Sequence, residues 1–451
     1  MPKFEKDLDI VKQVVNIHKP LLTDQTPFED QIKEQLSDVE FPFSVLRGFC
    51  FKEGSYTAVI HREKDGKKVL MDLEEGDTTD SMYGIAIDIG TTTVCGVLVD
   101  AKTGELLDAK TLTNDSVIES VHTYERTQDA DKILVKCKNI LEEYLSEQED
   151  IVSIGVTGQM HGIVYVDENG VAVSPLYTWQ DNSACEPYKD TTYTGFIERT
   201  VGRSIYGGYG LATHFYHKLN GMVPANASCL CTISDYAAMK LAGISRPYMH
   251  ISNAASLGLY NLKSNSYDFE AISRLELNEA LLPGIINQAK ILGENNGRGV
   301  CVGLGDNQAS FIGCVRDGQK EILLNVGTGS QISCMSGSIY QDSEIETRPL
   351  DGNKYLLVAS ALCGGRAYAM LERFFEEVLA MGGVKPRTLY MEMERAARNS
   401  RTAGLKTDTC FCGKRGEKQA LGSIKNISEG NFTPGALVES FLRGMAEELL
   451  P

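Results

Sequence analysis

Long hydrophobic runs and an excess of basic residues are both missing from this sequence. No stretch reaches the ~18 consecutive apolar residues of a membrane span, and residues 1–13 lack the apolar core of a signal peptide. The 44 Lys and Arg against 61 Asp and Glu give a net charge of -17 at pH 7. This balance argues against a nucleic-acid-binding protein and against a protein of anionic membrane surfaces, since both use Lys and Arg on phosphates.

Paired-cysteine motifs are also missing. The 12 cysteines include no CxxC pair, and the closest groupings are Cys229/Cys231 and Cys410/Cys412. One intervening residue is not the usual spacing of zinc ligands. We therefore expect reduced thiols in a cytoplasmic protein rather than a disulfide framework or a zinc site.

Several common catalytic signatures do not occur. The sequence has no GxxxxGK[ST], GxGxxG, HExxH or GxSxG motif, so P-loop and Rossmann nucleotide sites lose their main support. His214 and His217 are three residues apart in an expected helix. No carboxylate accompanies them at metal-ligand spacing, so we expect ordinary helix residues rather than metal ligands.

What the sequence does contain suggests a small N-terminal module ahead of larger α/β domains. At 451 residues the chain is long enough for two or three domains. Residues 9–19 have helical spacing, residues 55–73 predict a hairpin around Asp65-Gly66, and residues 74–81 resemble a linker. We expect residues 1–80 to form an α+β extension, and their sequence indicates no function.

From Tyr83 onward strands alternate with helices, as in layered α/β folds. The pattern predicts an amphipathic helix over 130–145, a strand over 151–158, and glycine-terminated helices over 234–243 and 365–383. Residues 83–100 and 321–337 are built alike, each with an apolar strand, a Gly/Thr turn and a second apolar strand. This repetition suggests a duplicated domain, and a chance likeness of two hairpins is the alternative.

The two turns have the composition of phosphate-binding loops. Backbone N–H groups and hydroxyls are what a phosphate needs, and the turns offer Thr91, Thr92, Thr93, Gly327, Thr328 and Gly329. Asp88 interrupts the first apolar strand just before its turn. Near phosphates it could hold Mg²⁺ through water, and stabilising the turn is the alternative role.

Three further stretches carry polar groups that suit a sugar. Gln159, Met160 and His161 follow a strand between two glycines, and Gln and His offer several hydrogen bonds to a polyol. Asp306 follows another strand and precedes a helical run, where it could be a helix N-cap or a general base. Trp179, the only tryptophan, could pack on a sugar or be a buried core residue.

In this order the motifs resemble those of the FGGY carbohydrate kinases. The matching stretches, from about Tyr83 to Pro451, are DIGTTTV, TGQMHG, YTWQDN, SDYAAMKLAG, SNAASLGLYNL, GLGDNQAS, NVGTGSQIS and CGGRAYAMLERF. The resemblance implies an α/β fold with two actin-like (ribonuclease-H-like) domains around an ATP cleft. We expect the first domain over 83–313 and the second over 314–451.

The resemblance also implies roles for individual residues. The expected phosphate and Mg²⁺ site consists of Asp88, Gly90, Thr91, Thr92, Gly327, Thr328 and Gly364. Asp306 matches the catalytic base, and the sugar is expected at Gln159, Met160, His161, Trp179, Asp181 and Asn307. The cosubstrate would be ATP with Mg²⁺, and a homodimer is compatible with the family.

Within the family, GQMHG resembles ketose kinases, and LYTWQDN with GGYGLATHFY is most similar to sedoheptulokinases. The expected substrate is therefore a ketose, sedoheptulose first, with xylulose or another sugar or polyol as the alternative. Ser183 stands where relatives often carry arginine. The chain stops at the helix before the glycine-rich segment that holds adenine in relatives, so we also expect an incomplete second domain and weigh an impaired, sugar-binding or regulatory protein.

Overall fold

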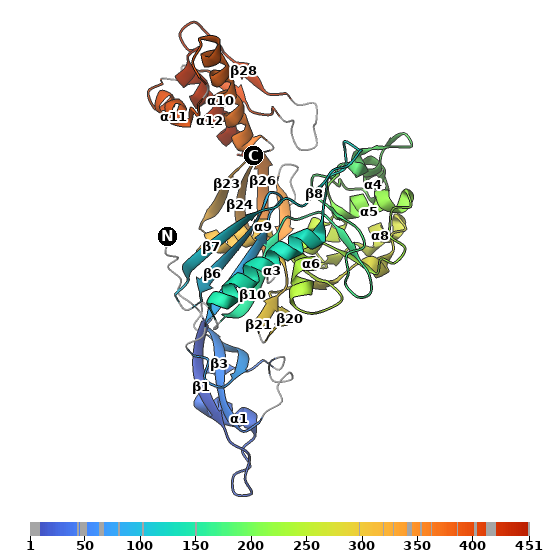
Figure 1. The fold of residues 1–451 in the computed structure, drawn as a ribbon, viewed down its shortest axis with the longest axis vertical. Coiled ribbons are helices and arrows are strands. Elements are labelled where there is room, and N and C mark those ends of the chain that lie inside the picture. Colours follow the sequence, from blue (N-terminus) through green and yellow to red (C-terminus); the bar gives the residue numbers. More distant parts are fainter. Residues whose placement is uncertain are drawn as a thin grey trace. The chain divides into compact units, whose positions relative to one another are not determined.

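A computed structural model provides the fold of the chain (Figure 1). It describes residues 10–42, 45, 52–62, 67–79, 82–101, 103–148, 151–296, 298–318, 320–327, 329–340, 345–351, 354–361, 363–385, 387–400, 404–411 and 421–449. The chain divides into two compact units, of which unit 1 holds 1–261 and 266–306 and unit 2 holds 262–265 and 307–451. Within the described ranges, no helix is both long and apolar enough to cross a membrane.

Among its described residues, the N-terminal module contains a four-stranded sheet and helix α1, drawn in blue in Figure 1. Its elements are β1 (Ile10–Ile17), α1 (Phe28–Gln35), β2 (Val39–Glu40), β3 (Gly54–Arg62) and β4 (Lys68–Glu75). The expected hairpin is confirmed, because β3 and β4 pair antiparallel, while Asp65-Gly66 lies outside the described residues. The helical expectation for residues 9–19 is wrong: they contain β1, which pairs with β3 along its whole length.

The physical reason for β1 lies in its composition and its partner. Five of its eight residues are Val or Ile. These β-branched side chains favour the pleated surface of a strand. Val15 and Ile17 are buried against Ile32 of α1 and the sheet. Spacing alone did not distinguish a half-buried strand from a helix, and the register with β3 decided it.

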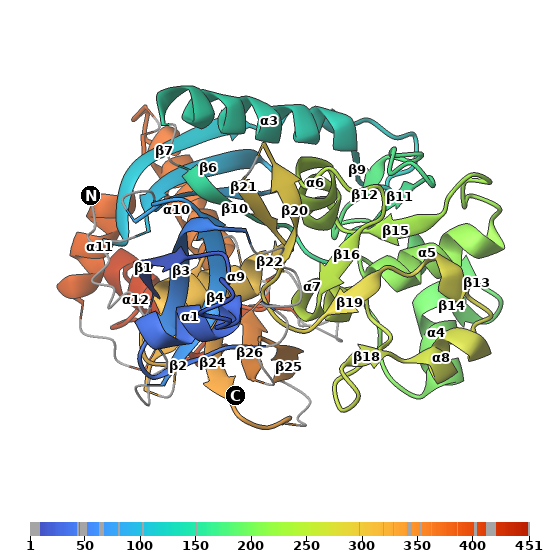
Figure 2. The same cartoon turned by 90° about the horizontal axis from the view of Figure 1, so that it is seen from below.

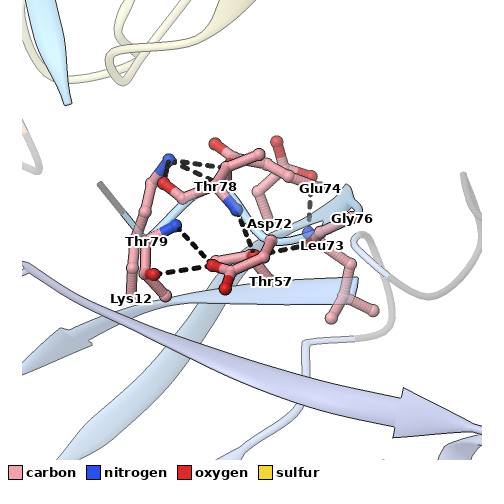
Figure 3. Close-up of polar contacts among 9 residues, drawn as sticks. Lys12, Thr57, Asp72, Leu73, Glu74, Gly76, Thr78 and Thr79 are labelled. Carbon is pink, nitrogen blue, oxygen red and sulfur yellow. Dashed lines mark hydrogen bonds and ion pairs between the residues drawn. The ribbon is translucent and has the colours of Figure 1, made fainter. Parts of the chain in front are cut away.

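A polar network ties the end of β4 to this sheet (Figure 3). The Lys12 ammonium, nearly inaccessible to solvent, lies 2.5 Å from the Glu74 carboxylate and donates to the Thr78 hydroxyl at 3.2 Å. The Thr57 hydroxyl donates to the Gly76 carbonyl and accepts from the Thr78 N–H. The residues expected to form a linker are therefore held by side chains of β1 and β3 as far as Thr78.

The large sheet of unit 1 has the order β20-β21-β10-β5-β6-β7, with β22 also paired to β10. Its strands are β5 (Tyr83–Ile89), β6 (Thr93–Asp100), β7 (Glu105–Thr113), β10 (Ile151–Gly158), β20 (Ile291–Asn295), β21 (Arg298–Cys301) and β22 (Leu304–Gly305). Strands β5, β6 and β7 form an antiparallel meander, whereas β10 is parallel to β5, β21 and β22. The predicted strands at 83–100 and 151–158 are confirmed.

Helix α3 (Ala130–Glu147) packs on one face of this sheet, as Figures 1 and 2 show. Asp129 caps its N-terminus through the N–H groups of Asp131 and Lys132. The predicted apolar stripe is buried at Ile133, Cys137, Ile140 and Leu141, and it meets Ile85, Ile87 and Ile89 of β5. Burial of these side chains fixes which face of β5 points inward.

Beyond the N-terminal module and the large sheet with α3, unit 1 contains short strands and helices, most of which follow β10. The helices are α4 (Tyr193–Val201), α5 (Gly210–Leu219), α6 (Ile233–Leu241), α7 (Ile251–Ser256), α8 (Phe269–Arg274), η1 (Ser183–Cys185) and η2 (Glu279–Leu281). The strands are β8 (Val117–Ile118), β9 (Thr127–Gln128), β11 (Val164–Val166), β12 (Leu176–Tyr177), β13 (Pro187–Tyr188), β14 (Thr191–Thr192), β15 (Cys229–Cys231), β16 (Tyr248–His250), β17 (Tyr260–Asn261), β18 (Ser266–Tyr267) and β19 (Gly284–Ile286). Helix α6 confirms the helix predicted over 234–243, which ends before Gly243 at φ 68°.

Unit 2 contains an antiparallel sheet of order β23-β24-β26-β25 and a group of helices. Its elements are β23 (Ile322–Val326), β24 (Ser330–Ser336), β25 (Glu346–Pro349), β26 (Tyr355–Ala361), α10 (Gly364–Met381), α11 (Tyr390–Arg398), β27 (Lys406–Asp408), β28 (Ser423–Lys425) and α12 (Pro434–Glu447). Helix α9 (Asp306–Cys314) crosses from unit 1 into unit 2 after its first residue. The hairpin predicted at 321–337 and the helix predicted at 365–383 are both confirmed.

Candidate active site

The turn between β5 and β6 is closed and supported by its own backbone and by one buried side chain. The Gly90 N–H donates to the Thr93 carbonyl at 2.9 Å. Asn114, buried beside the turn, donates through its amide to the Gly90 carbonyl at 2.9 Å and through its backbone to the Thr92 carbonyl at 2.8 Å. Thr92 remains exposed, so its hydroxyl and N–H are available to a phosphate.

Asp88 lies on the face of β5 opposite the buried isoleucines. The strand alternates strictly, which places Ile87 and Ile89 inside and the Asp88 side chain outside. Asp88 has no hydrogen-bond or ion-pair partner among the described residues, and no turn-stabilising contact involves its carboxylate. The carboxylate keeps access to water, yet the protein atoms around it partly desolvate it and raise its pKa.

Asp306 lies at the same sheet edge as the Asp88 turn, and this relationship is internal to unit 1. Gly158 pairs with Gly305 in the parallel β10–β22 ladder, and Thr157 pairs with Asp88 in the parallel β10–β5 ladder. Parallel strands end on the same side, so β5, β10 and β22 present their carboxyl ends together. Asp306 is exposed and is the first residue of α9.

The loop after β10 holds its three predicted site residues at different depths. Gln159 and Met160 are buried, each with 4% of its surface exposed. His161 is half-buried and has φ 72°, a left-handed conformation that non-glycine residues rarely adopt. At Gly162 a Cβ would lie 2.5 Å from the Tyr177 carbonyl oxygen, so only glycine fits there.

Two residues hold His161 in its unusual conformation. The His161 N–H donates to the Ser256 hydroxyl at 3.1 Å, and Nδ1 lies 2.7 Å from the Ser256 carbonyl oxygen. The imidazole stacks on the Tyr209 ring, with centroids 4.5 Å apart and planes 6° apart. A carbonyl can only accept, so Nδ1 carries the hydrogen and Nε2 of the neutral ring is an acceptor.

Trp179 connects this loop to the β5–β6 turn. Its side chain is 47% exposed, so the buried-core alternative is wrong, and its Nε1–H donates to the Thr91 hydroxyl at 3.1 Å. The Thr91 hydroxyl donates to Oε1 of the Gln159 side chain at 3.4 Å. Gln128 completes the network by donating to the Thr91 carbonyl and accepting from the Gln159 amide, both at 2.9 Å.

Asp181 is fully buried under the Trp179 loop. Its carboxylate accepts from the N–H and hydroxyl of Ser183 and from the Arg126 N–H at 3.1 Å. Burial is the largest influence on this carboxyl and raises its pKa, while the hydrogen bonds oppose that shift. These contacts shape the loop.

In unit 2 the second predicted phosphate turn lies against the start of α10. The Gly365 N–H donates to the Gly327 carbonyl at 2.7 Å, and a Cβ on Gly364 would lie 2.0 Å from the Ser330 hydroxyl. Thr328 lies outside the described residues. Asn307 donates to the Gln331 side chain at 2.9 Å and accepts from Arg348 at 3.1 Å.

Four supporting residues were not singled out by sequence reasoning: Asn114, Gln128, Tyr209 and Ser256. Tyr209 and Ser256 belong to stretches that carry the family resemblance, which is a usable signal. Asn114 and Gln128 have no local signal, because their roles depend on contacts 24 to 37 residues away in sequence.

The described residues include no group of three or more His, Cys, Asp or Glu side chains placed to hold a metal ion. A solitary, water-accessible carboxylate such as Asp88 suits Mg²⁺, which keeps most of its waters and uses one or two protein carboxylates beside substrate phosphates. The residues at the β5–β6 turn therefore fit a hydrated Mg²⁺ ion and do not fit a dehydrated all-protein metal site.

Known proteins resemble this chain in sequence and in fold. Residues 83–323 match the N-terminal domain of the FGGY family of carbohydrate kinases. Sedoheptulokinase from Homo sapiens is 28% identical over 408 residues, 81% of this chain and 84% of that protein. Xylulose kinase from Staphylococcus xylosus is 24% identical over 58% of this chain and 56% of that protein.

Two solved structures carry the fold comparison. A ligand-bound xylulose kinase from Lactobacillus acidophilus superposes with a TM-score of 0.70 at 19% identity, covering 82% of this chain and 77% of that chain. Plasmodium falciparum glycerol kinase with ADP gives a TM-score of 0.67 at 17% identity and the same coverage. The predicted α/β fold with two actin-like domains is thereby confirmed. The chain belongs to the FGGY family of carbohydrate kinases and is an ATP-dependent sugar kinase.

Proposed function

We propose that the protein transfers the γ-phosphoryl group of ATP to a terminal hydroxyl of a ketose, with sedoheptulose as the preferred substrate. The similarity to human sedoheptulokinase over four-fifths of the chain supports this choice of sugar. One observation supports the chemistry above all: an exposed carboxylate, Asp306, lies at the sheet edge that also presents the hydroxyl-lined turn and the His161 loop.

Asp306 is the base in this proposal. It accepts the proton of the sugar hydroxyl as the hydroxyl oxygen attacks the γ-phosphorus and the bond to the β-phosphate oxygen breaks. Phosphoryl transfer depends on positioning and charge stabilisation more than on covalent chemistry. Asp306 is exposed, so its carboxylate is accessible to a substrate hydroxyl.

The phosphate side is assigned to the two Gly/Thr turns. Gly90, Thr91 and Thr92 would donate to phosphate oxygens, and the family resemblance assigns the same chemistry to Gly327, Thr328 and Gly364. Asp88 would hold Mg²⁺ through water beside the first turn. When bound, Mg²⁺ neutralises charge on the phosphate oxygens.

The sugar side is assigned to the surface around His161 and Trp179. Nε2 of His161 would accept from a sugar hydroxyl, and the exposed indole face of Trp179 would cover apolar C–H groups. Gln159, Met160 and Asp181 lie beneath this surface and shape it, since all three are buried. Asn307 follows the base directly and is proposed to contact the sugar from the start of α9.

The test is a panel of ketoses and polyols with ATP and Mg²⁺, followed by ADP release. The proposal predicts the highest kcat/KM for sedoheptulose. A higher kcat/KM for xylulose would assign the protein to the alternative substrate, which the xylulose kinase relatives support. Sugar binding by calorimetry with no ADP release would instead indicate an impaired, sugar-binding member of the family.

A further inference from the structure

Helix α7 lies between the base and the sugar-binding histidine and carries the SNAAS stretch, for which the proposed function has no role. It has six residues, five of them buried, including three polar side chains. Ser252, Asn253 and Ser256 each bind a different segment of the candidate active site. Buried polar side chains in such a short helix need partners, and their partners here are functional segments.

Ser252 binds the backbone immediately before Asp306. Its hydroxyl, fully buried, accepts from the Gly305 N–H at 3.0 Å. The same hydroxyl lies 2.9 Å from Nδ1 of His250, which also accepts from the Ser252 N–H at 3.2 Å. Nδ1 is therefore the acceptor of both, and the Ser252 hydroxyl donates to His250 while accepting from Gly305.

Asn253 binds the same segment two residues before Gly305, at Gly303. Its amide donates to the Gly303 carbonyl at 3.2 Å and to the buried Asp235 carboxylate at 3.0 Å. A Cβ on Gly303 would lie 3.1 Å from Ser234 backbone atoms, so the strand passes close to α6. Residues 303–305 are thus held at two backbone groups just ahead of the base.

Ser256 binds the sugar loop from the other end of α7. Its hydroxyl accepts from the His161 N–H and donates to the Asn253 carbonyl at 2.7 Å, while its own carbonyl accepts from Nδ1 of His161. One turn of helix therefore separates the group that orients His161 from the group that positions the backbone before Asp306.

We propose that α7 is a positioning element that sets Asp306 and His161 relative to each other, with Ser252 acting through the base and Ser256 through the histidine. Neither serine touches substrate in this proposal. The inference rests on the proposed function, because it takes Asp306 as the base and His161 as a sugar ligand. A purely structural role of α7 would predict similar effects of both serines, whereas the positioning role predicts different kinetic effects for Ser252 and Ser256.

The test compares Ser252→Ala, Ser256→Ala and the matched control Ser440→Ala by kinetics and thermal unfolding. Ser252→Ala should lower kcat about 10- to 100-fold with little change in sugar KM, since small misplacement of a reacting group is costly. Ser256→Ala should raise sugar KM about 10-fold, the equivalent of one hydrogen bond, with a smaller effect on kcat. Ser440 is equally buried on α12, and its hydroxyl contacts the Thr407 hydroxyl and donates to the Leu437 carbonyl, so its variant should lose comparable stability and keep both constants.

A double-mutant cycle separates this inference from the base assignment. In an Asp306→Asn background, Ser252→Ala should cause no further loss of kcat, because its effect passes through the base. A full additional loss in that background would overturn the role of α7 while leaving the base in place. Near-normal turnover of Asp306→Asn itself would overturn the base assignment and the Ser252 role together.

If Ser252→Ala does not fold, Ser252→Cys provides the same comparison. The thiol is similar in volume and a weaker acceptor, so kcat should fall between wild type and the Ser252→Ala expectation. Equal shifts of kcat and KM in both serine variants, in parallel with Tm, would show that α7 only stabilises the fold.

Discussion

The carbonyl oxygen of Ser256 lies 2.7 Å from Nδ1 of His161, so Nδ1 carries a hydrogen and Nε2 is the ring nitrogen that can accept. This contact joins helix α7 to the loop after β10, 95 residues apart in sequence. Since His161 also has φ 72°, its orientation depends on tertiary contacts and not on its own backbone preference. Left-handed non-glycine residues of this kind cluster at functional sites.

Replacing His161 tests whether its imidazole binds the sugar. We expect His161→Ala and His161→Gly to raise the sugar KM about 10-fold or more while the KM for ATP stays unchanged, because an acceptor for a hydroxyl is lost. Glycine tolerates the positive φ at this position, whereas alanine does not. Similar values for the two variants would assign the effect to the imidazole, and a normal sugar KM in the glycine variant would remove His161 from the site.

Replacing Asp306 tests the base. We expect Asp306→Asn, which keeps the shape of the side chain, to lower kcat about 10²- to 10⁴-fold and to leave sugar binding nearly unchanged. Initial rates and calorimetric sugar titrations on the same preparation measure the two quantities. The base assignment is wrong if the variant binds sugar and turns over near the wild-type rate.

Replacing Trp179 separates its aromatic face from its hydrogen bond to Thr91. Trp179→Phe removes the Nε1 donor to the Thr91 hydroxyl of the proposed phosphate turn, and we expect a KM for ATP a few-fold higher with little change in the KM for the sugar. Trp179→Ala also removes the ring, so the sugar KM should rise as well. Identical kinetics for both variants would contradict the proposed sugar contact.

Two buried histidines predict acid sensitivity of folding. The Tyr165 hydroxyl lies 2.7 Å from Nδ1 of His214 and 3.1 Å from Nδ1 of His217. Burial lowers the pKa of His214 to about 4 and that of His217 to about 3. In the unfolded chain these histidines bind protons near pH 6.5, whereas in the folded protein they do so only near pH 4 and below. The free energy of unfolding is therefore highest above pH 6.5 and decreases as pH falls from 6.5 toward 4.

Denaturant unfolding between pH 8 and pH 5 measures this loss. The slope contributed by each histidine is at most about 1.4 kcal/mol per pH unit. His214→Gln and His217→Gln should each reduce the dependence, relative to wild type at the same pH. An unchanged slope in both buried variants would refute the assignment.

Asp235 leads us to expect the opposite pH dependence of stability. This fully buried carboxyl accepts from Thr232 and Asn253, and burial raises its pKa to about 7. The unfolded chain releases the proton near pH 4, so stability from this group is present at low pH and decreases as pH rises toward 7. Asp235→Asn should therefore gain stability relative to wild type between pH 5 and pH 8, measured by the same unfolding experiment. A constant difference across that range would contradict it.

Local sequence patterns were sufficient to predict most of the strands and helices that form the two hairpins and the helices packed on them. The apolar stripe of α3 and the alternation of β5 follow from side-chain period alone, because burial of one face is a local property of a helix or strand. The same reasoning wrongly predicted a helix where β1 lies. The strand forms because these residues pair with β3, some 40 residues later in the chain.

The sequence by itself determined the family, the hydroxyl-lined turn after Asp88, and the carboxylate at Asp306, because each depends on residues adjacent in the chain. Only the tertiary structure decided that Gln128 and Gln159 hold Thr91, that Trp179 is exposed, and that α7 joins the His161 loop to the strand before Asp306. These contacts join segments far apart in sequence. Which residues form these contacts depends on which strand ends and buried polar groups meet at one edge of the sheet. No local sequence pattern encodes that arrangement.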